Sequence, residues 1–153
     1  MNLTDFRVKI IQLIDEVSND QFDLIIGLSR GGLVPAVYLS HRFDIPMVIA
    51  DISHELSVGD NKNTHSGYLP KIADNIQSIL VVDDIVDSGN TILALTQQLE
   101  TTAKITVASL YIKDGAERYL IDEAPSNFVK CVYTEVLPID APFIYFPWEQ
   151  VNL

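Results

Sequence analysis

Residues 79–91 read I-L-V-V-D-D-I-V-D-S-G-N-T, and this stretch decides the fold. Its first four residues are apolar and β-prone, which is typical of a strand buried on both faces of a parallel sheet covered by helices. Two carboxylates, Asp83 and Asp84, follow where we expect the strand to leave the sheet. In open α/β sheets, ligands bind at the carboxyl ends of the strands. The stretch therefore predicts an α/β fold with a binding site at this edge.

The sequence continues after the acidic pair as Asp87-Ser88-Gly89-Asn90-Thr91. It supplies hydroxyl groups and a Gly that lets the backbone approach a ligand, just before a helix that we expect to begin at Thr91. The amino end of a helix presents unpaired N–H groups and a partial positive charge, so it can hold an anion without Lys or Arg. This segment therefore predicts a phosphate cradle.

All thirteen positions of this stretch resemble the 5-phosphoribosyl-1-pyrophosphate (PRPP) signature of the type I phosphoribosyltransferases. The resemblance implies that Asp83 and Asp84 face the ribose hydroxyls and the Mg²⁺ of PRPP, and that residues 88–91 surround the 5-phosphate. It also makes Asp87 the base or proton partner for the incoming nucleobase. Read separately, an apolar run is usually just a strand and Ser-Gly-Asn is usually just a turn. Their combination in one register is what points to PRPP.

The chain has 153 residues, of which ten are basic and twenty-one acidic, giving a net charge of −11. This length predicts a single domain with a substantial core. The negative charge argues against nucleic acid or an anionic membrane as a partner. An acidic protein that binds PRPP must neutralise the ligand locally, and a divalent metal with backbone N–H groups can do so. Mg²⁺ is therefore the expected cofactor.

Cys131 is the only cysteine, which excludes an intramolecular disulfide and is typical of a cytoplasmic protein. Its apolar neighbours predict a small buried side chain rather than a reactive thiol. The first ten residues lack the apolar run of a signal peptide, and no apolar run approaches membrane-spanning length. We therefore expect a cytoplasmic protein that is neither exported nor anchored.

The first part of the chain has the pattern of a βαβ unit preceded by a helix. Apolar residues between positions 6 and 17 recur at helical spacing, with Thr4 as the expected N-cap. A buried strand is expected over residues 24–28 and a helix over residues 33–43, with a Gly-rich loop between them. Residues 46–50 are expected to form the next strand.

The loop Ser29-Arg30-Gly31-Gly32 resembles the pyrophosphate loop of the purine phosphoribosyltransferases. Read alone, it would be a Gly-rich turn with a solvated Arg. With the PRPP signature also present, Ser29, Arg30 and Gly31 are expected to bind PRPP, because a guanidinium offers a rigid donor fork to phosphate oxygens. The resemblance further implies that the Ser29–Arg30 peptide bond is cis.

Residues 51–71 form a polar stretch, which inside a compact domain is usually a functional lid or disordered. The stretch resembles the mobile loop that closes over the reaction centre in the family. Many relatives carry Ser-Tyr at its start, whereas here Ser53 is followed by His54. His41, His54 and His65 show no metal-ligand spacing, and we interpret them as surface or loop residues.

Beyond the cradle, residues 92–99 are expected to continue the helix and residues 105–111 to form a further strand. Lys113 follows this strand. The resemblance makes Lys113 a contact to the exocyclic oxygen of a 6-oxopurine, and an ammonium donor prefers that oxygen over the amino group of adenine. Without the resemblance, Lys113 would be an ordinary solvated residue.

Residues 138–149 read P-I-D-A-P-F-I-Y-F-P-W-E and resemble the base-binding hood of the bacterial xanthine-guanine phosphoribosyltransferases. The resemblance implies that Phe143 stacks on the purine and that Ile144 offers backbone groups to the purine edge. It also makes Glu149 a metal-side carboxylate together with Asp84. Those enzymes usually have Trp and Asp where this chain has Phe143 and Glu149. The alternative interpretation is an aromatic C-terminal strand packed on the core.

These features predict one domain over residues 1–153 with the type I phosphoribosyltransferase fold, a mostly parallel sheet flanked by helices, and a hood over about residues 129–153. The resemblance implies Mg²⁺-dependent transfer of the phosphoribosyl group from PRPP to N9 of guanine, hypoxanthine or xanthine, as in purine salvage. Pyrophosphate is released, and the protein is expected to be a homo-oligomer, either a dimer or a tetramer. The expected catalytic residues are Asp87, Asp83, Asp84 and Arg30.

Two alternatives come from other functional classes. One is a PRPP-sensing regulator on the same fold without transferase activity, such as the RNA-binding pyrimidine attenuators, but the net charge of −11 counts against RNA binding. The other is a receiver-type signalling domain, in which an acidic pair also follows an apolar strand. There the pair lies near the amino terminus and no phosphate loop follows it.

Overall fold

The computed structural model describes residues 1–52 and 67–150. In this part of the chain, five strands form one sheet in the order β2-β1-β3-β4-β5, and every neighbouring pair is parallel. The strands are β1 (Leu24–Leu28), β2 (Met47–Ala50), β3 (Ser78–Val86), β4 (Lys104–Lys113) and β5 (Phe128–Leu137). The parallel α/β sheet predicted from the sequence is confirmed.

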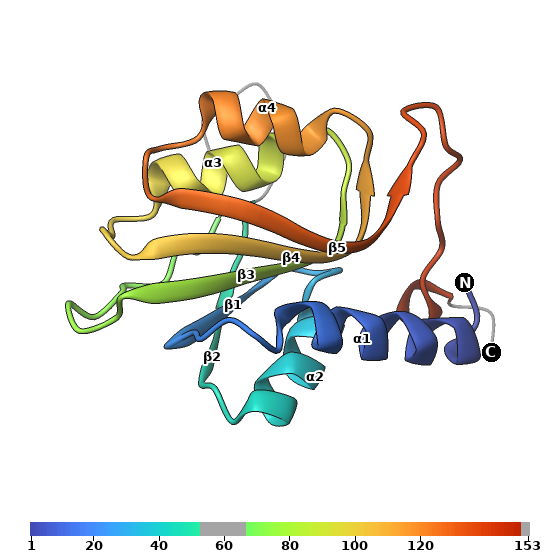
Figure 1. Cartoon of the computed structure of the whole chain (residues 1–153), viewed down its shortest axis with the longest axis horizontal. Coiled ribbons are helices and arrows are strands. Elements are labelled where there is room, and N and C mark those ends of the chain that lie inside the picture. Colours follow the sequence, from blue (N-terminus) through green and yellow to red (C-terminus); the bar gives the residue numbers. More distant parts are fainter. Residues whose placement is uncertain (53–66, 151–153) are drawn as a thin grey trace, which may run out of the picture.

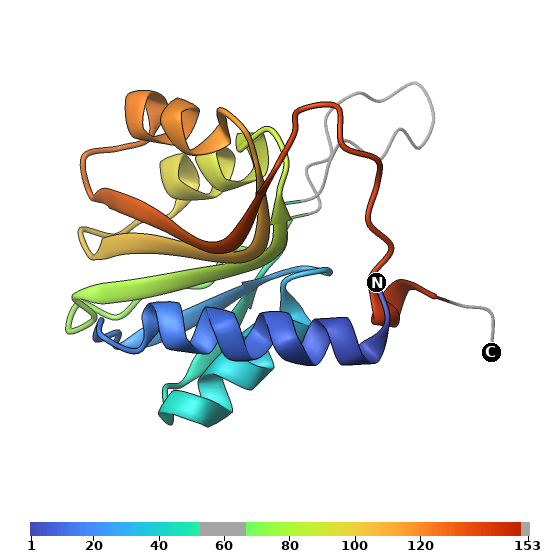
Figure 2. The ribbon, with the colours of Figure 1, turned by 45° about the vertical axis from the view of Figure 1, so that its right-hand side comes forward.

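Helices cover both faces of this sheet, as predicted (Figure 1). One face carries α1 (Leu3–Val17) and α2 (Leu33–Phe43), and the other carries α3 (Asn90–Gln98) and α4 (Ala116–Glu123). The chain then passes from β5 back to the amino end of α1, where the short 3₁₀ helix η1 (Pro147–Glu149) lies (Figure 2). None of the helices in residues 1–52 and 67–150 is long and apolar enough to span a membrane.

The apolar run of β3 contributes to two separate core layers. Ile79 and Val81 pack with α3 and α4, whereas Leu80 and Val82 pack with α1 and α2. All four side chains are completely buried. Because successive residues of a strand point to opposite faces, a strand covered on both sides needs apolar residues at every position. This explains why β3 reads as a continuous apolar run.

The acidic pair lies inside β3 rather than at its end, so the expectation that the strand leaves the sheet there is wrong. The strand continues to Val86, and its ladder with β4 continues through the pairs Asp83↔Ser109 and Ile85↔Tyr111. The reason is that β4 extends to Lys113 and offers backbone partners beyond the acidic pair. Both carboxylates are therefore held by a strand backbone rather than by a loop.

Two helix starts differ from the sequence-based expectation. The N-cap of α1 is Asn2, not Thr4, because the Asn2 Oδ1 accepts the Asp5 N–H at 2.9 Å and Asp5 bonds back to the Asn2 N–H. Asn caps helices at least as well as Thr, and the Asp three residues later completes a reciprocal pair of bonds. Helix α3 begins at Asn90, one residue before the expected Thr91, and Gly89 is its N-cap.

Two elements had no counterpart in the sequence analysis. Helix α4 has only eight residues and buries only Ala116 and Leu120, so it offers few apolar positions to a sequence pattern. Strand β5 places residues 128–137, the first part of the expected hood, in the central sheet. It is an edge strand with exposed positions, among them Val129 and Val136, so neither alternation nor a continuous apolar run marks it.

The loop after β1 lies directly against the carboxyl end of β3. A β-carbon on Gly32 would lie 2.1 Å from the backbone oxygen of Val82, and one on Gly31 would lie 2.1 Å from Asp84 Oδ2. Neither position therefore has room for a side chain. At Gly32 the obstacle is backbone, which cannot turn aside as a side chain can.

We expect Gly32→Ala to destabilise the protein by about 3 kcal/mol, the upper end of the usual cost of overpacking. The matched control is Gly115→Ala, where φ is 85° but no atom lies within 4 Å of the added carbon. The control should be destabilised only by the cost of placing Ala in a left-handed backbone conformation, about 1 kcal/mol. Urea unfolding of both variants measures the difference, and equal losses would contradict the close approach.

Candidate active site

The two carboxylates in the second half of β3 each have one oxygen that accepts a hydrogen bond from nearby backbone. Asp83 Oδ1 accepts the Asp84 N–H at 2.9 Å, and Asp84 Oδ1 accepts the Ile85 N–H at 2.8 Å. The Asp84 side chain is directed toward the Gly31 loop, and the residue is only 7% exposed. One oxygen of each carboxylate is thus engaged by backbone, and among the residues that the structure describes the other is not.

The acidic pair is electrostatically strained. Burial raises the pKa of Asp83 well above its ordinary value, and the adjacent charge of Asp84 raises it further. Burial also raises the pKa of Asp84, opposed by the hydrogen bonds from the Ile85 N–H and with Asp83, while the charge of Glu149 adds to the increase. A cation at this position would relieve the repulsion between these carboxylates.

Glu149 of η1 acts on the acidic pair through its charge. Its Oε2 accepts the Phe146 N–H at 2.9 Å, which fixes the start of η1, and its charge acts on Asp84. The structure thus brings Asp84 and Glu149, the two carboxylates predicted to face a metal, into one electrostatic neighbourhood. Within residues 1–52 and 67–150, no three His, Cys, Asp or Glu side chains gather as a metal cluster.

A small cavity of about 70 Å³ lies at the amino end of α3. Gly89 has a φ of 86°, a conformation that favours glycine, and this turns the chain into the helix. The Ser88 Oγ accepts the Asn90 N–H at 3.3 Å. The residues that line the cavity include those of the predicted phosphate cradle: Asp83, Ile85, Val86, Asp87, Ser88, Gly89, Asn90, Thr91 and Ile92.

Tyr119 supports this cradle and was not identified from the sequence. Its hydroxyl donates to Asn90 Oδ1 at 3.1 Å, and its ring lies close to Gly89. Tyr119 belongs to the short helix α4, and no local signal connects it to a residue 29 positions earlier. Only the packing of α4 beside α3 brings the two together.

The Ser29–Arg30 peptide bond is cis, as predicted. The loop is held by the Ser29 N–H, which donates to the Ala50 carbonyl at 2.8 Å, and by the Leu33 N–H, which donates to the Arg30 carbonyl at 3.2 Å. Arg30 is exposed, whereas Gly31 lies against Asp84. The predicted pyrophosphate loop and the acidic pair therefore form one continuous surface at the carboxyl ends of β1 and β3.

Lys113 and Asp87, for which the sequence predicted roles at the nucleobase, contact each other directly. Lys113 Nζ lies 3.0 Å from Asp87 Oδ1. Lys113 is the last residue of β4 and its side chain is largely covered, whereas the Asp87 side chain is mostly exposed. The ion pair links the end of β4 to the cradle loop.

The hood is attached to the body by aromatic contacts. The rings of Phe146 and Trp148 stack at 5.0 Å, and the Trp148 ring meets the edge of Phe6 of α1 at 5.2 Å. Phe143 is 69% exposed and touches Tyr145 edge-on. Residues 141–146 form no strand, so the alternative of an aromatic C-terminal strand is wrong.

The other predicted hood residue, Ile144, is half-buried against the core layer of α1 and α2. The amino-terminal ammonium of Met1 donates to the Tyr145 carbonyl at 2.8 Å, which ties the hood to the start of α1. The structure thus brings the hood to the same end of the sheet as the cradle. It does not bury the Phe143 ring against any core layer.

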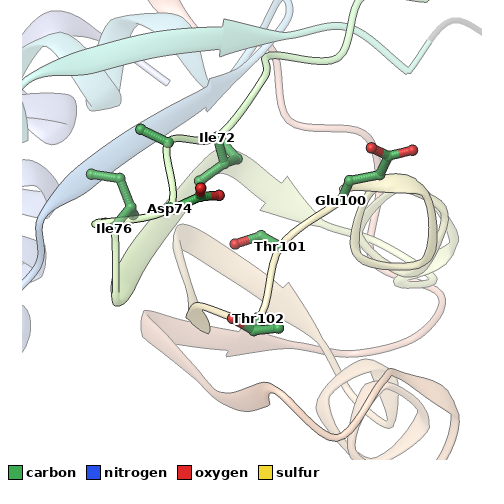
Figure 3. A pocket seen from close by; sticks show the side chains of 7 residues that line it. Ile72, Asp74, Ile76, Glu100, Thr101 and Thr102 are labelled. Carbon is green, nitrogen blue, oxygen red and sulfur yellow. The ribbon is translucent and has the colours of Figure 1, made fainter.

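A larger cavity of about 410 Å³ lies at the opposite edge of the sheet (Figure 3). Ile72, Asp74 and Ile76 come from the segment before β3, and Glu100 and Thr102 come from the segment before β4. It contains none of the predicted site residues. The amino ends of parallel strands are not where such sheets bind ligands, so cavity size alone does not identify the site.

Part of the expected loop over residues 51–71 lies outside the described residues, including Ser53, His54 and His65. At its two ends, Asp51 and Tyr68 exchange backbone hydrogen bonds of 2.8 and 2.9 Å in an antiparallel bridge. His41 is exposed on α2, as expected.

A family model described as "Phosphoribosyl transferase domain" matches residues 3–143. Xanthine-guanine phosphoribosyltransferase of Idiomarina loihiensis is 29% identical over 86% of this chain and 73% of the relative. The enzyme of the same name from Cereibacter sphaeroides is 30% identical over 86% of this chain and 72% of the relative.

Solved structures with the same fold include a xanthine-guanine-hypoxanthine phosphoribosyltransferase from Helicobacter pylori. It superposes with a TM-score of 0.70 at 24% identity, covering 97% of this chain and 91% of the other. A purine phosphoribosyltransferase from Pyrococcus horikoshii superposes with a TM-score of 0.61 at 24% identity, with 95% of each chain covered. At these identities the likeness shows the shared fold.

We expect Asp83→Asn to leave the ligand-free protein at least as stable as the wild type at about pH 7. Because the pKa of Asp83 is raised above its ordinary 3.8, the folded state binds more protons than the unfolded chain between the two values. Stability therefore falls as pH rises through this interval, and the full loss is present above the folded-state pKa. Asn does not ionise and so avoids this loss.

The advantage of the Asn variant should accordingly shrink toward about pH 4, near the ordinary pKa of 3.8, because the loss disappears as Asp83 takes up its proton. Thermal unfolding at both pH values measures it, with the exposed Asp140→Asn as the control. A large loss of melting temperature in Asp83→Asn at about pH 7 would mean that the carboxylate stabilises the fold.

Proposed function

The chain belongs to the phosphoribosyl transferase domain family, and we propose that this transferase uses PRPP and Mg²⁺ to convert a 6-oxopurine to its nucleoside 5′-monophosphate. The proposed bases are guanine, hypoxanthine and xanthine. The observation that carries the proposal is the meeting of three segments at one edge of the sheet. These are the acidic pair of β3, the cradle before α3 and the loop over residues 29–32. Relatives named xanthine-guanine phosphoribosyltransferase support the choice of base.

The residues at this edge fit Mg²⁺. Carboxylate oxygens are the hard ligands that Mg²⁺ prefers. Burial and the charge of Asp84 raise the pKa of Asp83, and burial and the charge of Glu149 raise the pKa of Asp84. Asp84 and Glu149 are the proposed metal-side carboxylates. When bound, the ion would supply the positive charge that an acidic protein lacks for an anionic substrate.

The chain's own groups would then divide the work on PRPP. Backbone N–H groups of residues 88–91 hold the 5-phosphate at the amino end of α3. Asp83 and Asp84 orient the ribose and stabilise the positive charge that develops on it in an oxocarbenium-like transition state. Arg30 and the N–H groups of its loop hold the departing pyrophosphate.

The nucleobase would lie between the cradle loop and the hood. Asp87 accepts the proton that the purine loses, and Lys113 donates to the exocyclic oxygen. Their 3.0 Å contact supports this assignment, because it places both groups at the same point beside the cradle. Phe143 stacks on the base, and its exposed ring leaves area for a planar ligand to cover.

The proposal is tested by measuring nucleotide formation from PRPP with guanine, hypoxanthine, xanthine, adenine, uracil and orotate. Asp84→Asn should lower turnover by about a hundredfold or more, through lost positioning and lost transition-state electrostatics. The exposed Asp140→Asn is the control and should retain activity. A protein that binds PRPP but forms no nucleotide from any base would instead fit the alternative of a PRPP-sensing regulator.

Base specificity is tested by two further variants. Lys113→Ala should weaken 6-oxopurines selectively, whereas Phe143→Ala should weaken every purine by about 1–3 kcal/mol through lost stacking. Lys104→Ala, at the other end of β4, is the matched control for Lys113. Competition binding with guanine and adenine separates the two effects. Use of uracil or orotate but no purine would overturn both base assignments.

A further inference from the structure

Ser109 of β4 is completely buried, with 0% of its surface exposed. Its Oγ has no hydrogen-bond partner in the described part of the chain. Buried hydroxyl groups normally have a hydrogen-bond partner. The buried Thr96 hydroxyl, for example, donates to the Leu93 carbonyl at 2.9 Å. An unpaired hydroxyl in the middle of the sheet therefore calls for a physical explanation.

The sheet register places Ser109 between two polar side chains. It pairs with Asp83 on β3 and with Tyr133 on β5. Val81 lies two residues before Asp83 on β3, and Val107 lies two residues before Ser109 on β4. Both valines pack in the same core layer with α3 and α4. Since residues two apart line one face of a sheet, Asp83 and Ser109 share that face. Asp83 and Ser109 therefore lie side by side on adjacent strands, and Asp83 lines the cradle cavity.

The Tyr133 hydroxyl already has a hydrogen-bond partner, whereas the Asp83 carboxylate can accept a further hydrogen bond. The Tyr133 hydroxyl donates to Glu117 Oε2 at 3.1 Å. The Asp83 carboxylate uses Oδ1 on the Asp84 N–H, and a carboxylate has two oxygens that can each accept more than one bond. Neighbouring strands lie about 5 Å apart, so a rotation about one side-chain bond can bring the Ser109 hydroxyl and the Asp83 carboxylate together.

We propose that Ser109 is a positioning residue that donates its hydroxyl to the second carboxylate oxygen of Asp83 when PRPP occupies the cradle. The inference rests on the proposed function of Asp83 at the ribose. A carboxylate that lines a cavity is free to turn until a ligand arrives, and a donor behind it then fixes its direction. The hydroxyl lacks a partner in the ligand-free protein because its partner is correctly placed only in the complex.

The test compares Ser109→Ala with Ser109→Thr, which keeps the hydroxyl. Calorimetry should show PRPP with Mg²⁺ binding about tenfold more weakly to the Ala variant, the size expected for a lost bond to a charged group. The ligand-free Ala variant should melt no lower than the wild type, because it loses an unpaired buried hydroxyl. Ser109→Thr should recover most of the affinity. A structural role would instead lower stability and affinity together.

Thr96→Val is the matched control, because it removes a buried hydroxyl that has a partner. It should lower the melting temperature and leave PRPP affinity unchanged. If Ser109→Thr fails to fold, a double-mutant cycle with Asp83→Asn decides the question. In the Asp83→Asn background, Ser109→Ala should lower PRPP affinity by a free energy less than about half of that in the wild type. The reason is that the partner of the Ser109 hydroxyl is already altered.

Full additivity in the cycle, or unchanged PRPP affinity in Ser109→Ala, would overturn the role of Ser109. These outcomes are distinct from failure of the proposed function. If the wild type binds no PRPP, the function itself is wrong. If it binds PRPP and Ser109→Ala binds equally well, only the positioning role is wrong.

Discussion

The loop at Gly31 and Gly32 lies so close to the carboxyl end of β3 that added β-carbons there would fall 2.1 Å from Asp84 Oδ2 and from the Val82 carbonyl oxygen. This contact puts the Arg30 loop and the acidic pair on one surface, although they are separated by more than fifty residues of sequence. It depends in turn on β1 and β3 being adjacent in the sheet. Steric contact between backbone segments, rather than attraction between charges, therefore assembles this edge. That suits a site whose own carboxylates repel each other.

The charge distribution fits the proposed binding of an anionic substrate to an acidic chain. In the part of the chain that the structure describes, Arg30 and Lys113 are the cationic side chains of the predicted site, and Lys113 is paired with Asp87. The cradle instead offers the amino end of α3, whose N–H groups act as donors without adding formal charge. Asp83 and Asp84 carry the negative charge of the predicted site, and the charge of Glu149 acts on Asp84; the proposed Mg²⁺ would offset this charge. Substrate charge would thus be neutralised by dipoles and metal more than by Lys and Arg.

The sequence was informative where local pattern and burial coincide. Strand β1 and helix α2 have the predicted bounds because a two-sided apolar run and a Gly-rich loop leave few alternatives. Strand β5 was missed because its pattern is set by distant partners, such as the ion pair of 2.6 Å between Lys9 of α1 and Glu135. Helix α4 is short, and its link to the cradle through Tyr119 exists only in the folded chain. The PRPP signature was readable because all its residues are contiguous, whereas Ser109 acquires its meaning only from the sheet register.

The position of the acidic pair inside β3 gives a physical reason for two adjacent carboxylates. Successive residues of a strand face opposite sides of the sheet, so the two side chains leave the backbone in different directions. Asp83 lines the cradle cavity beside α3, whereas Asp84 is directed toward Gly31 and lies in the field of Glu149. One carboxylate therefore faces the phosphate cradle while the other faces the pyrophosphate loop and the hood. The two carboxylates nevertheless remain close enough to interact, because the charge of Asp84 adds to the increase that burial causes in the pKa of Asp83.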